Sequence, residues 1–166
     1  MPYFAAPDIL KLDDDAELAW KAIEHVWDAA PYTSRELPAF LAELTQGQAA
    51  LYAVDCVQKD IRNAGYRDLF FNASGNLVPA ALDGFQMIDA EAYVANLSAA
   101  MSLLGDGYPP SAAARKRALA EQGEAALSRL EVLSDSFLDL LDMAATDLEK
   151  FRSSYVRANP EEFVAA

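Results

Sequence analysis

Residues 111–158 read SAAARKRALAEQGEAALSRLEVLSDSFLDLLDMAATDLEKFRSSYVRA, and this stretch decides the fold class. Ser111 is the expected N-cap of a helical tail that Asn159-Pro160 ends. Two interruptions are expected inside the tail, at Ser134-Asp135-Ser136 and near Thr146, which begins a capping-box pattern. Apolar side chains recur at the spacing of an amphipathic helix, and those on one side are Leu133, Phe137, Leu140, Leu141 and Ala144.

Helical spacing also extends over the N-terminal half of the chain. Asp13-Asp14-Asp15 predicts the N-cap and acidic first turn of a helix that reaches about residue 30, where Pro31 ends it. Gly65 is the expected stop of a later helix. The further helices are expected from Thr33 or Ser34, with Thr33 and Glu36 as a capping box, and over about residues 48–63, 79–88 and 90–104, with Gly47 as a divider and Asp89 as a cap.

The composition of the chain supports the same fold class. Alanine accounts for 33 of the 166 residues, whereas Val, Ile and Thr together number 15. Because alanine favours helices and β-branched residues favour strands, this composition argues against a large sheet. We therefore expect an all-α fold, with residues 13–166 forming a compact single domain of about seven to nine helices. Residues 1–12, which contain Pro2 and Pro7, are expected to form an extended N-terminal arm.

Acidic residues outnumber basic ones by 26 to 13, which gives a net charge of −13. Direct binding to nucleic acid or to an anionic membrane needs clustered Lys and Arg, so the composition argues against both. It favours either plain solubility or a basic protein partner. The N-terminus lacks the pattern of a signal peptide and no apolar run is long enough to span a bilayer, so we expect a cytoplasmic protein.

Residue types that perform catalysis or bind metals are scarce in this sequence. His25 is the single histidine and Cys56 the single cysteine, which excludes an intrachain disulfide and any repeated His or Cys spacing of a metal site. Neither a phosphate-binding loop nor a dinucleotide-binding glycine pattern occurs. We therefore expect a non-enzymatic protein without a cofactor or metal, in which Cys56 lies in the core.

Acidic residues instead gather on two helix faces. Those of the tail recur at 4-4-3 spacing without an intervening Lys or Arg, whereas solvated faces usually mix both charges. An ordinary solvated face is the simpler interpretation, and Glu124 and Glu149 would extend the tail's face if its helix were continuous. The expected partner-binding residues form the N-terminal acidic face, which is Asp13, Asp14, Glu17, Glu24 and Asp28, and the C-terminal acidic face, which is Glu131, Asp135, Asp139 and Asp142.

A single face of this kind is too sparse to imitate DNA. Carboxylates four residues apart on a helix lie about 6 Å apart along its axis. Duplex DNA carries one negative charge per roughly 1.7 Å of its axis. Mimicry therefore predicts several faces side by side or a homodimer. In either case we expect Trp20 and Trp27 to pack in the core or in the dimer interface.

Short motifs follow one another in the middle and at the end of the chain. They are Asp60-Ile61-Arg62-Asn63-Ala64-Gly65-Tyr66, Phe70-Phe71-Asn72-Ala73-Ser74-Gly75, Ile88-Asp89-Ala90 and the close Tyr155-Val156-Arg157-Ala158-Asn159-Pro160-Glu161-Glu162-Phe163. In this order and spacing, residues 36–163 resemble the DNA mimic protein nineteen-like family, a helical domain family of unknown function. Asp60, Ala64 and Tyr66 stand where Glu, Gly and Phe are usual in the family.

The resemblance implies an all-helical fold. In the family's described relative it also implies an acidic homodimer that covers the DNA-binding surface of a transcription regulator and relieves its repression. In a structural interpretation of the motif, Asn63 and Asn72 bond to backbone at the helix stop and turn, and the aromatic side chains fill the core. In a functional one, Asp60, Asn63 and Asn72 line a pocket. The motif residues are Asp60, Asn63, Gly65, Tyr66, Phe70, Asn72 and Gly75.

Two other functions agree with the same sequence. An immunity- or antitoxin-like inhibitor would also be acidic and metal-free, and it would compete with the substrate of a partner enzyme. A small-ligand-binding or enzymatic domain would use the Asp60-Asn63-Asn72 cluster, and a deep pocket beside Asn63 would support it.

Overall fold

The computed structural model describes residues 3–33 and 35–165. These residues form helices and connecting segments, and their one β contact is a single bridge between Ala5 and Val164. The predicted all-α fold of seven to nine helices is therefore confirmed. The eight α-helices of the described residues are α1 (Asp15–Ala29), α2 (Leu37–Glu43), α3 (Gln46–Phe71), α4 (Val78–Met87), α5 (Glu91–Ser102), α6 (Ala112–Gln122), α7 (Glu124–Asp142) and α8 (Leu148–Ala158).

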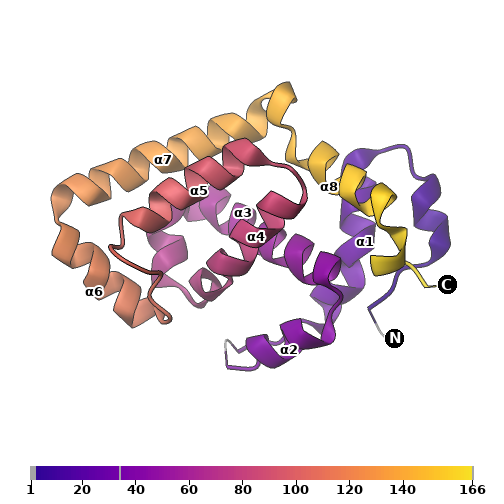
Figure 1. The fold of residues 1–166 in the computed structure, drawn as a ribbon, viewed down its shortest axis with the longest axis horizontal. Helices are drawn as coiled ribbons and strands as arrows, with labels where there is room; N and C mark the ends of the chain where they lie inside the picture. The colour runs from indigo at the N-terminus through magenta and orange to yellow at the C-terminus, as the bar shows by residue number, and fades with distance from the viewer. Residues whose placement is uncertain (1–2, 34, 166) are drawn as a thin grey trace.

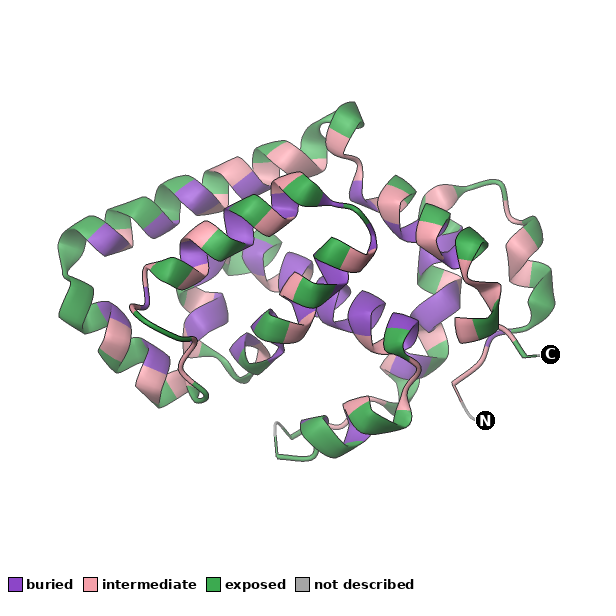
Figure 2. Cartoon of the chain, in the orientation of Figure 1, coloured by how far each residue is buried: buried purple, intermediate pink, exposed green. Residues whose placement is uncertain are grey.

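Helix α3 runs through the middle of the molecule and positions the others (Figure 1). Helices α1 and α8 pack together at one end of it, α4 and α7 pack along it, and α6 lies at the other end. Because α3 has neighbours on several sides, all of residues 50–58 are buried (Figure 2). Four buried rings, Tyr66, Phe85, Tyr93 and Phe137, contact one another between α3, α4, α5 and α7.

The two chain ends meet beside α1 and α8 (Figure 1). The Ala5 amide donates to the Phe163 carbonyl at 2.8 Å. The prediction of an extended arm over residues 1–12 is wrong for Pro7–Lys11, which form a 3-10 helix, and residues 1–2 lie outside the described part of the chain. The guanidinium of Arg157 holds the end of this 3-10 helix by donating to the carbonyls of Leu10 at 3.2 Å and Leu12 at 2.6 Å.

Two predicted helix caps are confirmed by their hydrogen bonds. The Asp14 carboxylate accepts from the Glu17 amide at 2.7 Å and so caps α1. The Ser111 hydroxyl accepts from the Ala114 amide at 3.2 Å and caps α6. Each cap satisfies one of the free N–H groups that begin a helix.

The predicted helix start at Thr33 is wrong, and its alternative, Ser34, lies outside the described residues. Helix α2 begins at Leu37, and the Thr33 hydroxyl donates to the Glu36 carboxylate at 2.7 Å instead of capping an amide. A helix that began three residues earlier would place Pro38 beyond its first turn, where the missing N–H of proline leaves a helix carbonyl without a donor.

The predicted role of Gly47 as a divider is also wrong, because this residue lies in the first turn of α3. The capping box there is formed by Thr45 and Gln48. A Cβ at position 47 would meet the Phe163 ring at 2.7 Å, so the glycine permits close packing of the C-terminal segment.

Helix α7 is continuous where Ser134-Asp135-Ser136 was expected to break it. The hydroxyls of Ser134 and Ser136 donate to carbonyls four residues earlier, at 2.8 and 2.9 Å, and thus stay within the helix. The break lies instead at Gly123, whose φ of +79° separates α6 from α7. The later interruption is confirmed, although Asp147 rather than Thr146 caps the restarted helix.

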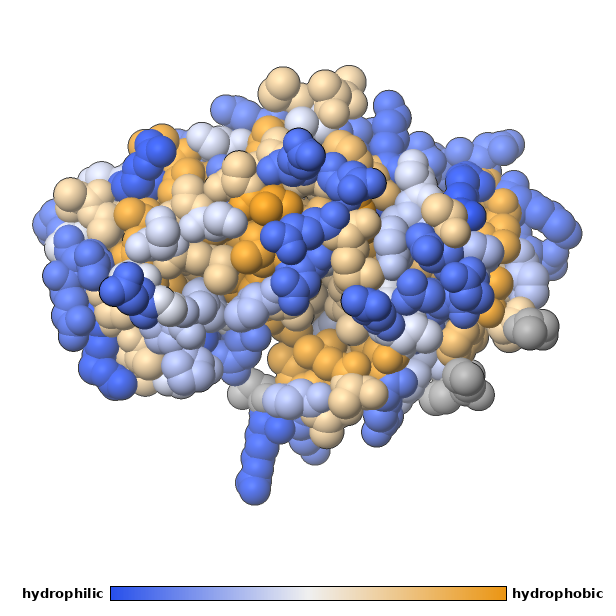
Figure 3. Space-filling view, viewed as in Figure 1, coloured by the Kyte–Doolittle hydropathy of each residue, from blue (hydrophilic) through white to orange (hydrophobic). Residues whose placement is uncertain are grey.

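Asp89 does not cap α5 as expected. Its φ is +57°, in the left-handed region, and the Ala90 N-cap of α5 makes no side-chain capping bond. No α-helix of the described residues is both long and apolar enough to cross a bilayer. Hydrophilic side chains border the face shown in Figure 3, and apolar atoms gather toward its middle.

Candidate functional site

The C-terminal acidic face lies on one uninterrupted helix. Its four carboxylate residues are all exposed on α7, and the exposed Glu124 continues the same face toward the start of that helix. Glu149 does not extend it, because α7 ends at Asp142 and Glu149 belongs to α8. The face therefore presents acidic side chains from one end of α7 to the other.

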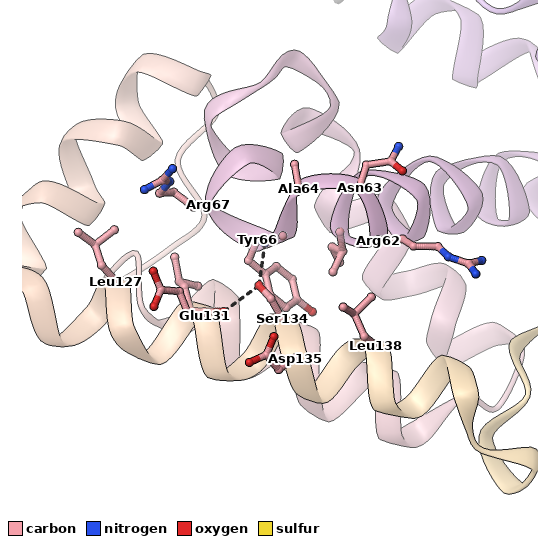
Figure 4. A pocket seen from close by; sticks show the side chains of 13 residues that line it. Arg62, Asn63, Ala64, Tyr66, Arg67, Leu127, Glu131, Ser134, Asp135 and Leu138 are labelled. Atoms are coloured by element: carbon pink, nitrogen blue, oxygen red, sulfur yellow. Dashed lines mark hydrogen bonds between the residues drawn. The ribbon is translucent and has the colours of Figure 1, made fainter.

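Part of this face borders basic side chains of α3. Glu131 and Asp135 line a cleft of about 360 Å³ between α7 and the second half of α3, and Arg62 and Arg67 line it from the other side (Figure 4). Both arginines are exposed. Their positive charge makes the potential at this part of the face less negative. Asp139 and Asp142 lie beyond the cleft and are farther from this effect.

The N-terminal acidic face contains a base of its own helix. Lys21 lies between the acidic positions of α1, and its Nζ contacts the Glu24 carboxylate at 2.7 Å. The hydrogen bond from Lys21 lowers the pKa of Glu24. Glu24 is half-buried, whereas Asp13, Asp14, Glu17 and Asp28 are exposed.

The two acidic faces lie on different parts of the molecule. Helix α1 packs on α8 and α3, while α7 packs on α3, α5 and α6. Figure 1 shows α1 and most of α7 toward opposite ends of the molecule. The structure therefore does not bring the two faces together within one copy.

The tryptophans of α1 lie beside α3 rather than in the deepest part of the core. Trp20 is 39% exposed and Trp27 is half-buried. Both indole rings lie against the Lys59 ammonium, at 5.0 and 4.4 Å from the ring centroids. The prediction that they fill the core is thus wrong for Trp20, and its alternative, a dimer interface, stays a prediction.

The motif glycine Gly65 bends α3 and docks it on α7. Its φ is +78°, where residues with a side chain are strained, and the helix resumes at once with Tyr66. The Ser134 hydroxyl accepts from the Tyr66 amide at 3.0 Å and donates to the Leu130 carbonyl (Figure 4). The helix stop predicted at Gly65 is therefore a kink, and α7 satisfies the amide that the kink frees.

A buried arginine holds the second half of the motif. Arg115 is 0% exposed, and its guanidinium donates to the carbonyls of Phe70 at 2.7 Å and Asn72 at 3.0 Å. It also donates to the Asn76 side chain at 3.0 Å. Burial lowers the pKa of Arg115, which bonds to neutral oxygens. A Cβ at Gly75 would meet this guanidinium at 2.7 Å, so this position requires glycine.

The structure does not gather Asp60, Asn63 and Asn72 into a pocket. Asp60 accepts a hydrogen bond from the Ser74 hydroxyl. Asn63 is exposed, borders the cleft and points away from α7 (Figure 4). Asn72 is exposed at the end of α3, and its backbone carbonyl meets Arg115.

The structural interpretation of the motif is right for its aromatic residues and wrong for its asparagines. Tyr66 and Phe70 are fully buried. Within the described part of the chain, the side chains of Asn63 and Asn72 make no hydrogen bond to backbone. Sequence reasoning missed Arg115, which lies 45 positions from Phe70 and carries no local signal.

A buried cluster of opposite charges joins α1, α3 and α8. Asp55 accepts from the Trp27 indole at 2.9 Å and contacts Arg152 at 3.2 Å and Lys59 at 2.6 Å. Arg152 also bonds to Glu149, whose pKa is raised by burial. Two of its nitrogens, Nε and Nη2, are buried without a hydrogen-bond partner among the described residues. This cluster anchors the helix pair α1–α8 to the centre of the molecule.

Comparison with known proteins assigns most of the chain to a family. Residues 42–159 match the family described as DMP19-like protein. No curated protein and no solved structure matches the chain. Among the described residues, no group of three or more His, Cys, Asp or Glu is arranged to hold a metal ion.

Proposed function

Because the chain belongs to the DMP19-like protein family, we propose that it is a DNA mimic, a non-enzymatic acidic protein that covers the DNA-binding surface of a basic partner such as a transcription regulator. The observation that carries this proposal is the C-terminal acidic face. Four exposed carboxylates stand on one continuous helix, with no Lys or Arg between residues 131 and 142.

The charge density of this face makes a homodimer part of the proposal. Asp142 lies eleven positions after Glu131, which corresponds to about 16 Å along the helix axis. Duplex DNA presents roughly nine negative charges over that length. One face supplies fewer than half of them, and two copies of α7 brought side by side would approach the required density.

The test is capture of partners from a lysate of the source cell at low salt, with and without competing duplex DNA. A DNA-binding protein that is eluted by a salt step and displaced by the duplex supports the proposal, because exposed charges are screened within about 8 Å at physiological ionic strength. A partner that resists both salt and duplex DNA contradicts it.

Two charge variants make the test specific to the face. Asp135→Lys with Asp139→Lys removes its centre, and we expect at least a tenfold loss of affinity for the captured partner. The matched control is Asp83→Lys with Asp106→Lys, two exposed carboxylates of α4 and a loop that lie outside both acidic faces. Equal losses in the two variants would show that net charge, rather than the face, drives binding.

One observation favours the inhibitor function as second candidate. The two acidic faces are apart, so a single copy does not present the continuous charge of a duplex. A partner enzyme blocked at its substrate site needs only one of them. In the capture experiment this partner would resist duplex DNA and would be released by its own substrate.

A further inference from the structure

A groove opens where α1 ends and the chain turns into α2. Its volume is about 510 Å³, and α2, which forms one wall, projects from the body of the molecule (Figure 1). Within it the rings of Tyr3 and Phe40 pack edge to face, with their centroids 5.8 Å apart. Tyr32 lies at its rim and is 106% exposed. The Tyr32 ring is therefore open to a partner that enters the groove.

The polar residues of the groove are acidic. Asp28, Glu36 and Glu43 line it, and its described lining contains no Lys or Arg. Among the described residues, Glu36 and Glu43 accept hydrogen bonds from neutral hydroxyls alone, of Thr33 at 2.7 Å and of Tyr3 at 2.9 Å. These bonds orient the carboxylates without neutralising them, so the groove keeps three negative charges.

Most of the groove lies outside the part of the chain that matches the family. The family match begins at residue 42, and of the residues named above only Glu43 lies within it. It also lies away from α7, whose acidic residues carry the proposed function (Figure 1).

We propose that this groove binds a basic segment of a partner protein, in which Lys or Arg side chains flank one large aromatic or apolar side chain. The apolar side chain contacts Tyr3 and Phe40, and the flanking cations pair with Asp28 and Glu36. Tyr32 stacks on one of these cations, because an aromatic face attracts positive charge. Charge complementarity selects this occupant over an acidic or purely apolar one.

The test uses the acetylated and amidated peptide Lys-Arg-Trp-Lys-Arg as probe, added to the full-length protein labelled with ¹⁵N. We expect chemical-shift changes at the amides of Tyr32, Phe40 and Glu43, with an affinity that weakens as salt increases. A peptide of the same charge with Gly in place of Trp should bind at least fivefold more weakly. Equal affinities for the two peptides, or no saturable shifts, would overturn the proposal.

Variants of exposed residues separate the groove from general attraction to an acidic protein. Tyr32→Ser should weaken binding about fivefold and Asp28→Asn with Glu36→Gln about tenfold, with the folded spectrum retained. The charge-matched control, Asp83→Asn with Asp106→Asn, should bind as the wild type does. Shifts confined to α7 would overturn the groove while leaving the proposed function intact, whereas failure of the capture experiment would leave the groove unaffected.

Discussion

The two acidic faces contain similar numbers of carboxylates but lie in different electrostatic surroundings. On α1, Lys21 lies within the face and pairs with Glu24. On α7, Arg129 precedes the four acidic residues, and Arg62 and Arg67 of α3 line the cleft beside Glu131 and Asp135. Asp139 and Asp142 lie outside that cleft. The surroundings of each charge, more than the number of charges, distinguish the two faces.

The two ends of the molecule are also anchored by different chemistry. At the α1 end, the anchor is a network of opposite charges around Asp55. At the α6–α7 end, Arg115 bonds to backbone carbonyls, and Ser134 bonds to a backbone amide. A charge network depends on every member, because each ion left unpaired in a buried site is costly. The ends should therefore respond differently to the loss of one side chain.

The largest effect is expected from Asp55→Ala. This change leaves Arg152 buried without its aspartate partner and removes the acceptor of the Trp27 indole. We expect a loss of about 3–5 kcal/mol in the free energy of unfolding, measured by urea denaturation. Glu17→Gln, an exposed change on α1, is the control and should cost little. A loss below 1 kcal/mol for Asp55→Ala would mean that the network does not stabilise this end.

Arg115→Met should cost somewhat less. The variant leaves the carbonyls of Phe70 and Asn72 without donors, and we expect a loss of about 2–3 kcal/mol. The neighbouring exposed residue offers a matched control, since Lys116→Met removes the same charge from the same helix. If both variants unfold at the same urea concentration, Arg115 does not hold the motif in place.

Local signals in the sequence were enough to predict most of the fold. Asp14 and Ser111 cap the helices expected of them, because a cap depends on residues three positions apart. The wrong predictions concern residues whose conformation depends on contacts with residues far away in the sequence. Phe163 packs on Gly47, and Ser134 stays helical while it bonds to the distant Tyr66 amide. Neither contact leaves a pattern in the local sequence.

The candidate site was predictable only in part, for the same reason. The 4-4-3 spacing places the C-terminal acidic residues on one side of α7, where all four are exposed. That Arg62 and Arg67 lie beside this face depends on the packing of α3 against α7, which a helical pattern does not reveal. The residues that line the groove beside Tyr32 likewise come from separate positions between 3 and 43, which the turn after α1 brings together. No sequence motif marks this groove.

Charge reversal of each face measures the difference between them directly. Asp135→Lys with Asp139→Lys should weaken partner binding at least tenfold, whereas Glu17→Lys with Asp28→Lys should weaken it less than threefold. The contrast follows because Lys21 already reduces the negative potential of the N-terminal face. Titration of the captured partner at two salt concentrations measures both effects. A larger loss for the α1 variant would assign the main binding surface to α1.

The smallest effect is a pH dependence at the α1 end, where Glu149 pairs with Arg152. Burial raises the pKa of Glu149 in the folded state above its ordinary value of 4.5. The folded protein therefore holds this proton to higher pH than the unfolded chain, and its contribution to stability falls as the pH rises through that range. Glu149→Gln removes the titration, so the free energy of unfolding should decline less steeply with pH just above 4.5 in the variant. If the free energy of unfolding changes with pH in the same way in the wild type and the variant, the ion pair with Arg152 offsets the burial of Glu149.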